Sequence, residues 1–214
     1  MSLVDNLIKD GWLKTPEIIN AFKKIKREDF LPEESKNLAE LNEALPIGLG
    51  QTISQPLTVA FMLELLQPKP GDKILDVGAG SGWTSALLAE ITGDKGKVVA
   101  IEFIPELAEF GIKNLTKYNF IEKRIIKYIC ANGSKGFLPA GRQVKKNSQN
   151  TEIYDKILIS ASSPSGVSME LKEQLRMGGR IVCPIKESIW LYIKKLENEF
   201  EKKEYPGFVF VPLV

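Results

Sequence analysis

The stretch ILDVGAGSGW, residues 74–83, decides the fold class of this chain. A mostly apolar run typical of a buried strand leads into three glycines at alternate positions, Gly78, Gly80 and Gly82. Glycine adopts positive φ readily and has no Cβ to hold a ligand away from the backbone. A glycine-rich turn at the carboxyl end of the first parallel strand is where doubly wound α/β folds bind nucleotides. The stretch therefore predicts a nucleotide or nucleoside site built on bare backbone.

Strand and helix patterns alternate after this stretch. We expect strands at 73–77, 97–102, 124–130, 154–160 and 180–185, and helices at 84–91, 105–118 and 168–179. Ser168 is placed to cap the last of these helices, and the Gly178-Gly179 pair to end it. Two further strands, 188–197 and 207–214, have no helical pattern between them. The alternation predicts a doubly wound, mostly parallel sheet of about seven strands, with an antiparallel C-terminal hairpin at one edge.

The N-terminal part reads as helical. Thr15 can cap a helix whose first position is Pro16, and apolar residues then follow at helical spacing. Residues 45–54, LPIGLGQTIS, read as a Gly- and Pro-containing loop that leads into a helix over 56–66. The segment 139–152 is polar and unpatterned, and we expect an exposed insertion there.

Composition excludes several function classes. Lys plus Arg number 29 and Asp plus Glu 27, so charge gives no reason to expect nucleic acid or an anionic membrane as partner. The chain has no histidine, which excludes a histidine-based zinc site, a Ser-His-Asp triad and a Cys-His pair, and we expect no metal. Cys130 and Cys183 lie in apolar runs and read as buried thiols of a reducing compartment. With no signal peptide or membrane-spanning run, we expect a cytoplasmic monomer.

The glycine spacing separates two cofactor classes. Dinucleotide enzymes use G-x-G-x-x-G, but here G-A-G-S-G is followed by Trp83, which suits walling in a nucleoside better than cradling a pyrophosphate. Asp76 would be unwelcome beside two phosphates and can instead hold the amides of the turn. Glu102 ends the next strand about 20 residues beyond Gly82, where a carboxylate accepts hydrogen bonds from ribose hydroxyls. This arrangement resembles the glycine motif of class I methyltransferases, which have a Rossmann-like fold and bind S-adenosylmethionine.

A more specific resemblance begins upstream of the glycines. The stretch ALPIGLGQTISQP (44–56), followed by LDVGAGSG, resembles the protein-L-isoaspartate O-methyltransferases. The likeness continues through FLPEE, ASSP (161–164), QLRMGGRIVCPI (174–185) and the terminal FVPLV. It implies methyl transfer from S-adenosylmethionine to the free α-carboxylate of L-isoaspartyl residues in damaged proteins and peptides, leaving S-adenosylhomocysteine. The chemistry suits a chain without histidine, because a carboxylate with a pKa below about 4 is ionised at neutral pH and needs no general base.

The resemblance also implies site residues. The catalytic residue is the serine of the TIS motif, Ser54, which from local sequence alone could equally be a helix N-cap two residues before Pro56. The implied substrate-binding residues are Thr52, Ser54 and Val214. The implied cofactor-binding residues are Gln51, Thr52, Ile53, Asp76, Gly78, Ala79, Gly80, Ser81, Gly82, Glu102, Asn132 and Gly133. We expect one domain over 1–214, with a helical extension at 1–45, a substrate loop and helix at 46–72 and a cofactor-binding sheet at 73–214.

The chain departs from the family pattern at several positions. Asn132 stands where the family usually has an Asp near the adenine, and Leu57 where it has a His. These departures leave open a methyltransferase of the same scaffold that acts on another carboxylate or small molecule. A third alternative is a protein that binds cofactor or peptide without turnover. The presence of Thr52, Ser54 and all three glycines counts against that alternative.

Overall fold

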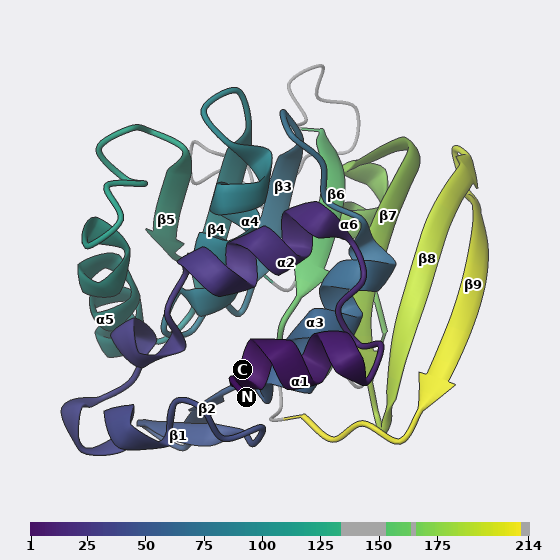
Figure 1. The fold of residues 1–214 in the computed structure, drawn as a ribbon. Helices are drawn as coiled ribbons and strands as arrows, with labels where there is room; N and C mark the ends of the chain where they lie inside the picture. The colour runs from purple at the N-terminus through teal and green to yellow at the C-terminus, as the bar shows by residue number, and fades with distance from the viewer. Residues whose placement is uncertain (134–152, 164–165, 211–214) are drawn as a thin grey trace.

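The computed structural model describes residues 1–133, 153–163 and 166–210 (Figure 1). The predicted insertion at 139–152 and the predicted substrate residue Val214 lie outside these residues.

The described residues form one large sheet in the order β5-β4-β3-β6-β7-β8-β9 (Figure 1). The strands β5, β4, β3, β6 and β7 are parallel, whereas β8 pairs antiparallel with both β7 and β9. The predicted α/β class, the seven strands and the antiparallel hairpin at one edge are confirmed. The strands are β3 (Lys73–Val77), β4 (Lys97–Glu102), β5 (Ile126–Cys130), β6 (Tyr154–Ile159), β7 (Leu175–Ile185), β8 (Ser188–Leu196) and β9 (Glu199–Pro206).

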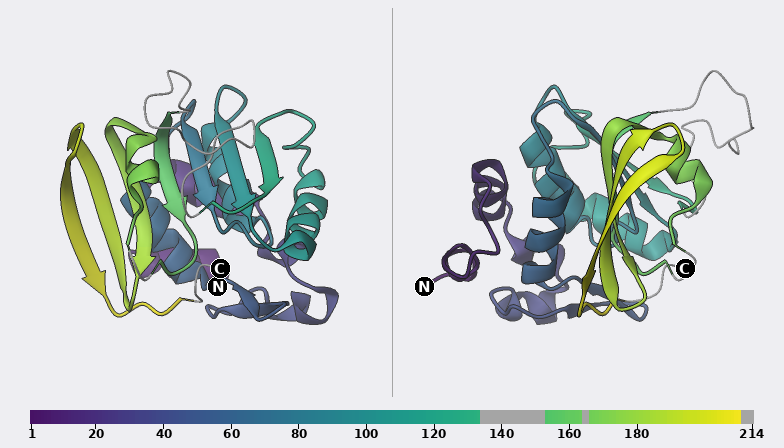
Figure 2. Two further views of the ribbon diagram at one scale, coloured as in Figure 1. Left: turned by 180° about the vertical axis from the view of Figure 1, so that it is seen from behind. Right: turned by 90° about the vertical axis from the view of Figure 1, so that its right-hand side faces the viewer.

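Helices cover both faces of the sheet, because the strands are apolar on both sides. In β3, Ile74 and Leu75 are both fully buried, and they belong to two different hydrophobic clusters. The larger cluster contains side chains of α3 (Pro56–Leu66), α4 (Trp83–Thr92) and α5 (Pro105–Thr116). The smaller cluster contains Leu171 of the short α6 (Met169–Glu173). The right-hand view of Figure 2 shows α3 and α4 on one side of the sheet and α6 on the other.

The N-terminal extension packs outside α3 and α4. It consists of α1 (Leu3–Lys9), α2 (Pro16–Lys24) and two 3-10 helices, η1 (Arg27–Phe30) and η2 (Glu33–Leu38). Pro16 is the first residue of α2, as predicted, and Thr15 occupies the N-cap position. The Thr15 side chain makes no capping bond, because its hydroxyl donates to Glu64 of α3 at 2.7 Å.

Three sequence-based predictions of local structure are wrong. The first is the loop at 45–54, which is a small antiparallel sheet of β1 (Leu45–Gly48) and β2 (Gln51–Ile53). Its turn residues, Leu49 and Gly50, have φ values of 54° and 71°. Positive φ at both central residues gives a turn whose twist matches a two-stranded hairpin. The sequence did not predict this hairpin, because its turn has leucine where Asn, Asp or Gly is usual.

The second is the helix at 168–179. Ser168 caps α6 as predicted, its hydroxyl accepting from the Leu171 amide, but the helix ends at Glu173. The strand β7 starts at Leu175 and runs through the glycine pair, and its pairing with β6 shifts register there. Gly178 has a φ of 72°, and a Cβ on Gly179 would lie 2.8 Å from the Leu175 side chain. The glycines therefore permit an irregularity within a strand and do not end a helix.

The third is the strand at 207–214. The outer strand of the hairpin is β9, Glu199–Pro206, and residues 207–210 have no regular structure. Its sequence, EFEKKEYP, is largely charged and exposed, as is common for an edge strand that must not pair with other chains. The strand β9 was not predicted, because its charged residues do not form an alternating apolar pattern.

Candidate active site

The candidate site lies where the parallel strands end. The glycine turn follows β3, Glu102 is the last residue of β4, and Ser160 directly follows β6. Figure 1 shows the small β1–β2 sheet near the carboxyl ends of the parallel strands. A small, partly open pocket of about 30 Å³ lies there, lined by Thr52, Ile53, Ser54, Gly78, Ala79, Gly80, Ser81, Trp83, Thr84 and Ser160. The structure thus brings the TIS motif and the glycine turn together, although they are separate in the sequence.

All three glycines have positive φ, at 80° for Gly78, 53° for Gly80 and 88° for Gly82. Gly78 and Gly80 line the pocket. Gly82 does not, and it serves the packing of α5: a Cβ on it would lie 3.1 Å from the Leu115 side chain and 3.3 Å from the Gly111 carbonyl. The turn therefore uses two glycines to expose backbone to the pocket and one to let a helix approach.

Gly80 is held on both sides. Its amide donates to Oε2 of Glu102 at 2.9 Å, and its carbonyl accepts from the Tyr128 hydroxyl at 2.7 Å. Oε1 of Glu102 accepts from the amides of Phe103 at 2.8 Å and Ile104 at 3.0 Å. Burial, followed by the nearby Glu102 charge, raises the pKa of Tyr128 well above its usual value, so the hydroxyl keeps its proton. An ionised carboxylate has about four acceptor positions, so Glu102 can accept a further hydrogen bond beyond these three.

Asp76 lies behind the pocket and does not line it. It is fully buried, and its two oxygens accept hydrogen bonds from the hydroxyls of Thr84 at 3.0 Å, Ser85 at 2.6 Å and Ser160 at 3.0 Å. The prediction that it holds amides of the turn is wrong, because its partners are hydroxyls. Burial raises the pKa of Asp76, and the three hydroxyls oppose that rise. Its contacts orient two side chains that do line the pocket, Thr84 and Ser160.

The hydroxyls of Thr52 and Ser54 are available to a ligand. The N-cap of α3 is Gln55, so the alternative reading of Ser54 as a helix cap does not describe the structure. No described residue forms a hydrogen bond with either hydroxyl, and both residues line two spaces at once. One is the pocket at the glycine turn and the other is a groove of about 1010 Å³ beside α3. Ser160 lines both as well, and sequence reasoning missed it; its position directly after a parallel strand is the signal that could have found it.

Arg27 of η1 fixes the backbone next to the site. It is buried, and its guanidinium donates to the carbonyls of Ala39 at 3.1 Å, Leu41 at 3.0 Å, Glu43 at 2.7 Å and Ser54 at 3.3 Å. Burial lowers the pKa of Arg27 to about 10, which leaves it charged at neutral pH. Its guanidinium carbon lies 5.4 Å from the centre of the Trp83 ring.

Trp83 lines the pocket, but little of its surface faces it, and a role beside a nucleoside stays a prediction. Only 3% of this residue is exposed, and its ring packs edge-on against Phe22 at 5.7 Å between ring centres. The first turn of α4 points this side chain toward the N-terminal extension, so that it touches the pocket while most of the ring belongs to the core.

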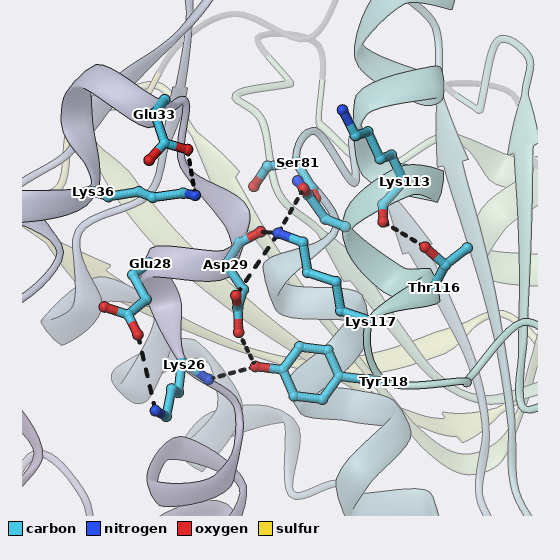
Figure 3. A network of polar contacts seen from close by, with 11 residues as sticks. Lys26, Glu28, Asp29, Glu33, Lys36, Ser81, Lys113, Thr116, Lys117 and Tyr118 are labelled. Atoms are coloured by element: carbon cyan, nitrogen blue, oxygen red, sulfur yellow. Dashed lines mark hydrogen bonds and ion pairs between the residues drawn. The ribbon is translucent and has the colours of Figure 1, made fainter.

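Polar contacts join the N-terminal extension to α5 and the glycine turn (Figure 3). The Tyr118 hydroxyl donates to Asp29 of η1 at 2.7 Å and accepts from the Lys26 amide at 2.9 Å. One turn of helix away, the Asn114 side chain donates to the Ser81 carbonyl at 3.1 Å. Through Arg27 and Asp29, the short η1 helix therefore contacts both the backbone at Ser54 and the residues that directly follow α5, the helix that supports the glycine turn.

Several predicted residues lie outside the small pocket. Gln51 and Gly82 do not line it, and neither do Asn132 and Gly133. Asn132 is exposed, and a Cβ on Gly133 would lie 2.8 Å from the Val77 side chain, so glycine there allows close packing on the sheet. Glu102, which is 7% exposed, does not line the pocket either. The cofactor-binding and substrate-binding roles of all the predicted site residues stay predictions.

The cysteines differ from each other. Cys183 is buried as predicted, and burial raises the pKa of its thiol to about 12. Cys130 is exposed, contrary to prediction, because it ends an edge strand of the sheet. Among the described residues, no three acidic or cysteine side chains gather as metal ligands would. The helices of the described part are too short or too polar to cross a membrane.

Comparison with known proteins agrees with this geometry. The family model for protein-L-isoaspartate(D-aspartate) O-methyltransferase matches residues 1–214. The protein-L-isoaspartate O-methyltransferase of Methanopyrus kandleri is 38% identical, over 99% of this chain and 89% of that protein. The enzyme of the same name from Ignicoccus hospitalis is 39% identical, over 99% and 95%. A crystal structure from Plasmodium falciparum, described as a protein-L-isoaspartate O-methyltransferase in complex with S-adenosyl-L-homocysteine, shares the fold with a TM-score of 0.83 at 22% identity, over 99% of this chain and 96% of that one. This chain is therefore a member of the protein-L-isoaspartate(D-aspartate) O-methyltransferase family.

Proposed function

We propose that this chain transfers a methyl group from S-adenosylmethionine to the free α-carboxylate of L-isoaspartyl residues in damaged proteins and peptides. The observation that carries the proposal is that Thr52, Ser54 and Ser160 line both the pocket at the glycine turn and the adjoining groove. A donor in the pocket and an acceptor in the groove would meet at these hydroxyls. Family membership supports the same activity.

The chemistry of the residues around the glycine turn suits the cofactor. The backbone of Gly78, Ala79, Gly80 and Ser81 would lie against it, and Glu102 would accept a ribose hydroxyl at its remaining acceptor position. When bound, S-adenosylmethionine supplies an electrophilic methyl group on a positively charged sulfur. The three amide contacts to Glu102 fix its carboxylate before binding, which lowers the entropy cost of holding the ribose.

The substrate side of the site suits a carboxylate nucleophile. The α-carboxylate is already ionised at neutral pH, so no residue has to remove a proton. Of the described residues that line the groove, none carries a charge. Hydroxyls such as those of Thr52 and Ser54 can orient the carboxylate without the strong pairing that a lysine or arginine would impose. Alignment and exclusion of water are then the main contributions of the protein.

The test is radiolabelled methyl transfer to two peptides that differ only in isoaspartate versus aspartate. We expect label on the isoaspartyl peptide alone. Ser54→Ala should lose most of this transfer and bind S-adenosylhomocysteine with nearly unchanged affinity by calorimetry. Ser2→Ala is the matched control, because Ser2 is exposed and lines neither the pocket nor the groove; it should keep full activity. Label on neither peptide, with the cofactor bound, would refute the proposed acceptor.

We further propose that the protein acts as a monomer in the cytoplasm. The nearly balanced charge and the ordinary hydrophobic content of 43% support this proposal. Light scattering of the full chain should give the mass of one copy, 23.9 kDa. A mass of two copies would contradict it.

A further inference from the structure

One side of the groove is aromatic. Phe61 of α3 packs edge-on against Trp12 at 5.9 Å between ring centres and against Tyr205 at 5.2 Å, and it stacks on Phe208 at 5.2 Å. The four rings come from the segment between α1 and α2, from α3, from β9 and from the residues after β9. We call them the aromatic wall. Because distant parts of the chain build it, its presence could not be read from any one motif.

The aromatic wall is neither part of the closed core nor fully exposed. All four of its residues are partly buried, and all four line the groove that Ser54 also lines. Apolar surface left open beside polar groups is typical of a binding site. The absence of charge among the described lining residues means that a charged side chain would lose hydration there without gaining a partner.

The wall lies a short distance from Ser54 along α3. The helix begins at Pro56, and Leu57 and Phe61, four residues apart on one face, both line the groove. A rise of 1.5 Å per residue places Phe61 about 7 Å along the helix from its start. An extended peptide covers that distance in about two residues.

We propose that the aromatic wall binds a bulky apolar side chain, aromatic or aliphatic, that lies one to three residues from the isoaspartate in the substrate. The occupant is a protein or peptide segment whose isoaspartyl carboxylate is held at Ser54, so the inference rests on the proposed function. The continuity of the wall with the carboxylate site and the uncharged lining are the reasons for this occupant. The wall thereby sets a preference among damaged sites, favouring those next to apolar sequence.

The test compares kcat/KM for isoaspartyl peptides that carry Phe, Ala or Glu at each position within three residues of the isoaspartate. At one or more positions we expect kcat/KM for the Phe peptide to be about tenfold higher than for the Ala peptide, which is the usual selectivity of a hydrophobic pocket. We expect kcat/KM for the Glu peptide to be lower than for the Ala peptide. In the Phe61→Ala variant, and separately in the Trp12→Leu variant, the ratio of kcat/KM for the Phe peptide to kcat/KM for the Ala peptide should fall toward one. Binding of S-adenosylhomocysteine shows whether each variant is folded.

Phe200→Ala is the matched control. Phe200 is also a partly buried aromatic of β9, but it packs against Tyr192 and does not line the groove. This variant should keep the wild-type ratio of kcat/KM between the Phe and Ala peptides. If all isoaspartyl peptides are methylated equally well whatever their neighbours, the aromatic wall has no such role, while the proposed function stands. If no isoaspartyl peptide is methylated, both proposals fail.

Discussion

Gly111 offers a test of how the cofactor turn is supported from behind. It lies inside α5, where an added Cβ would meet the Tyr128 hydroxyl at 2.6 Å and the Gly80 carbonyl at 2.8 Å. These two atoms form the hydrogen bond that holds Gly80. Gly111→Ala must therefore move Tyr128, the glycine turn or the helix, although Gly111 does not line the pocket.

Two opposing terms decide the effect on stability. Alanine is favoured over glycine inside a helix by about 1 kcal/mol. Overpacking of a tight contact costs about 1–3 kcal/mol. The net loss is about 0–2 kcal/mol, which lowers the melting temperature of a chain of this size by at most about 8 °C. If the free variant instead relieves this strain by moving Gly80, and binding requires Gly80 at its wild-type position, the strain of about 1–3 kcal/mol is taken from cofactor affinity, a roughly 5- to 150-fold increase in Kd.

Calorimetry with S-adenosylhomocysteine measures the affinity, and thermal unfolding measures the stability of the same sample. Lys113→Ala is the matched control, because Lys113 is an exposed residue of the same helix and its replacement adds no packing contact. It should bind with wild-type affinity. A Gly111→Ala variant whose Kd stays within twofold of wild type would show that the turn does not depend on this contact.

Three further predictions concern buried charges. Arg27→Met leaves four carbonyls without their donor and should lower the free energy of unfolding by about 3–5 kcal/mol in urea titrations, at about 1 kcal/mol for each buried acceptor left unsatisfied. Arg27→Lys should lose less stability, and equal stability of all three proteins would contradict the role given to the guanidinium. Glu102→Ala should weaken binding of S-adenosylhomocysteine by about tenfold or more, as calorimetry would show, because a charged acceptor that also holds Gly80 is lost. Asp76 has a pKa raised above its unfolded value, so its contribution to stability is present below that unfolded pKa and is lost as pH rises through the folded pKa. The stability of Asp76→Asn relative to wild type should therefore increase from pH 4 to pH 7, and a difference that does not change with pH in urea titrations would refute the assignment.

Local patterns were sufficient for the elements with strong periodicity. The strand at 73–77, the helix that follows Gly82 and the antiparallel edge were all predicted, because burial on both faces gives apolar runs and helices repeat every 3.6 residues. The hairpin at 45–53 and the edge strand β9 were not predicted. The pairing of the hairpin depends on a turn with leucine at positive φ, and its apolar alternation at Leu45 and Ile47 is too short to predict a strand. The pairing of β9 depends on largely charged residues at a sheet edge.

The sequence by itself determined the fold class and the chemistry of the turn, because Gly78, Gly80 and Glu102 act through backbone conformation and charge, which are properties of the residues and their spacing. Only the tertiary structure decided which groups share the site. Ser160 lies beside the glycine turn because parallel strands end on the same side of a sheet, and Ser54 lines the same pocket because the separate β1–β2 sheet lies there. The aromatic wall forms because three distant segments pack against Phe61. Such contacts depend on the relative placement of whole elements, a quantity that no local pattern encodes.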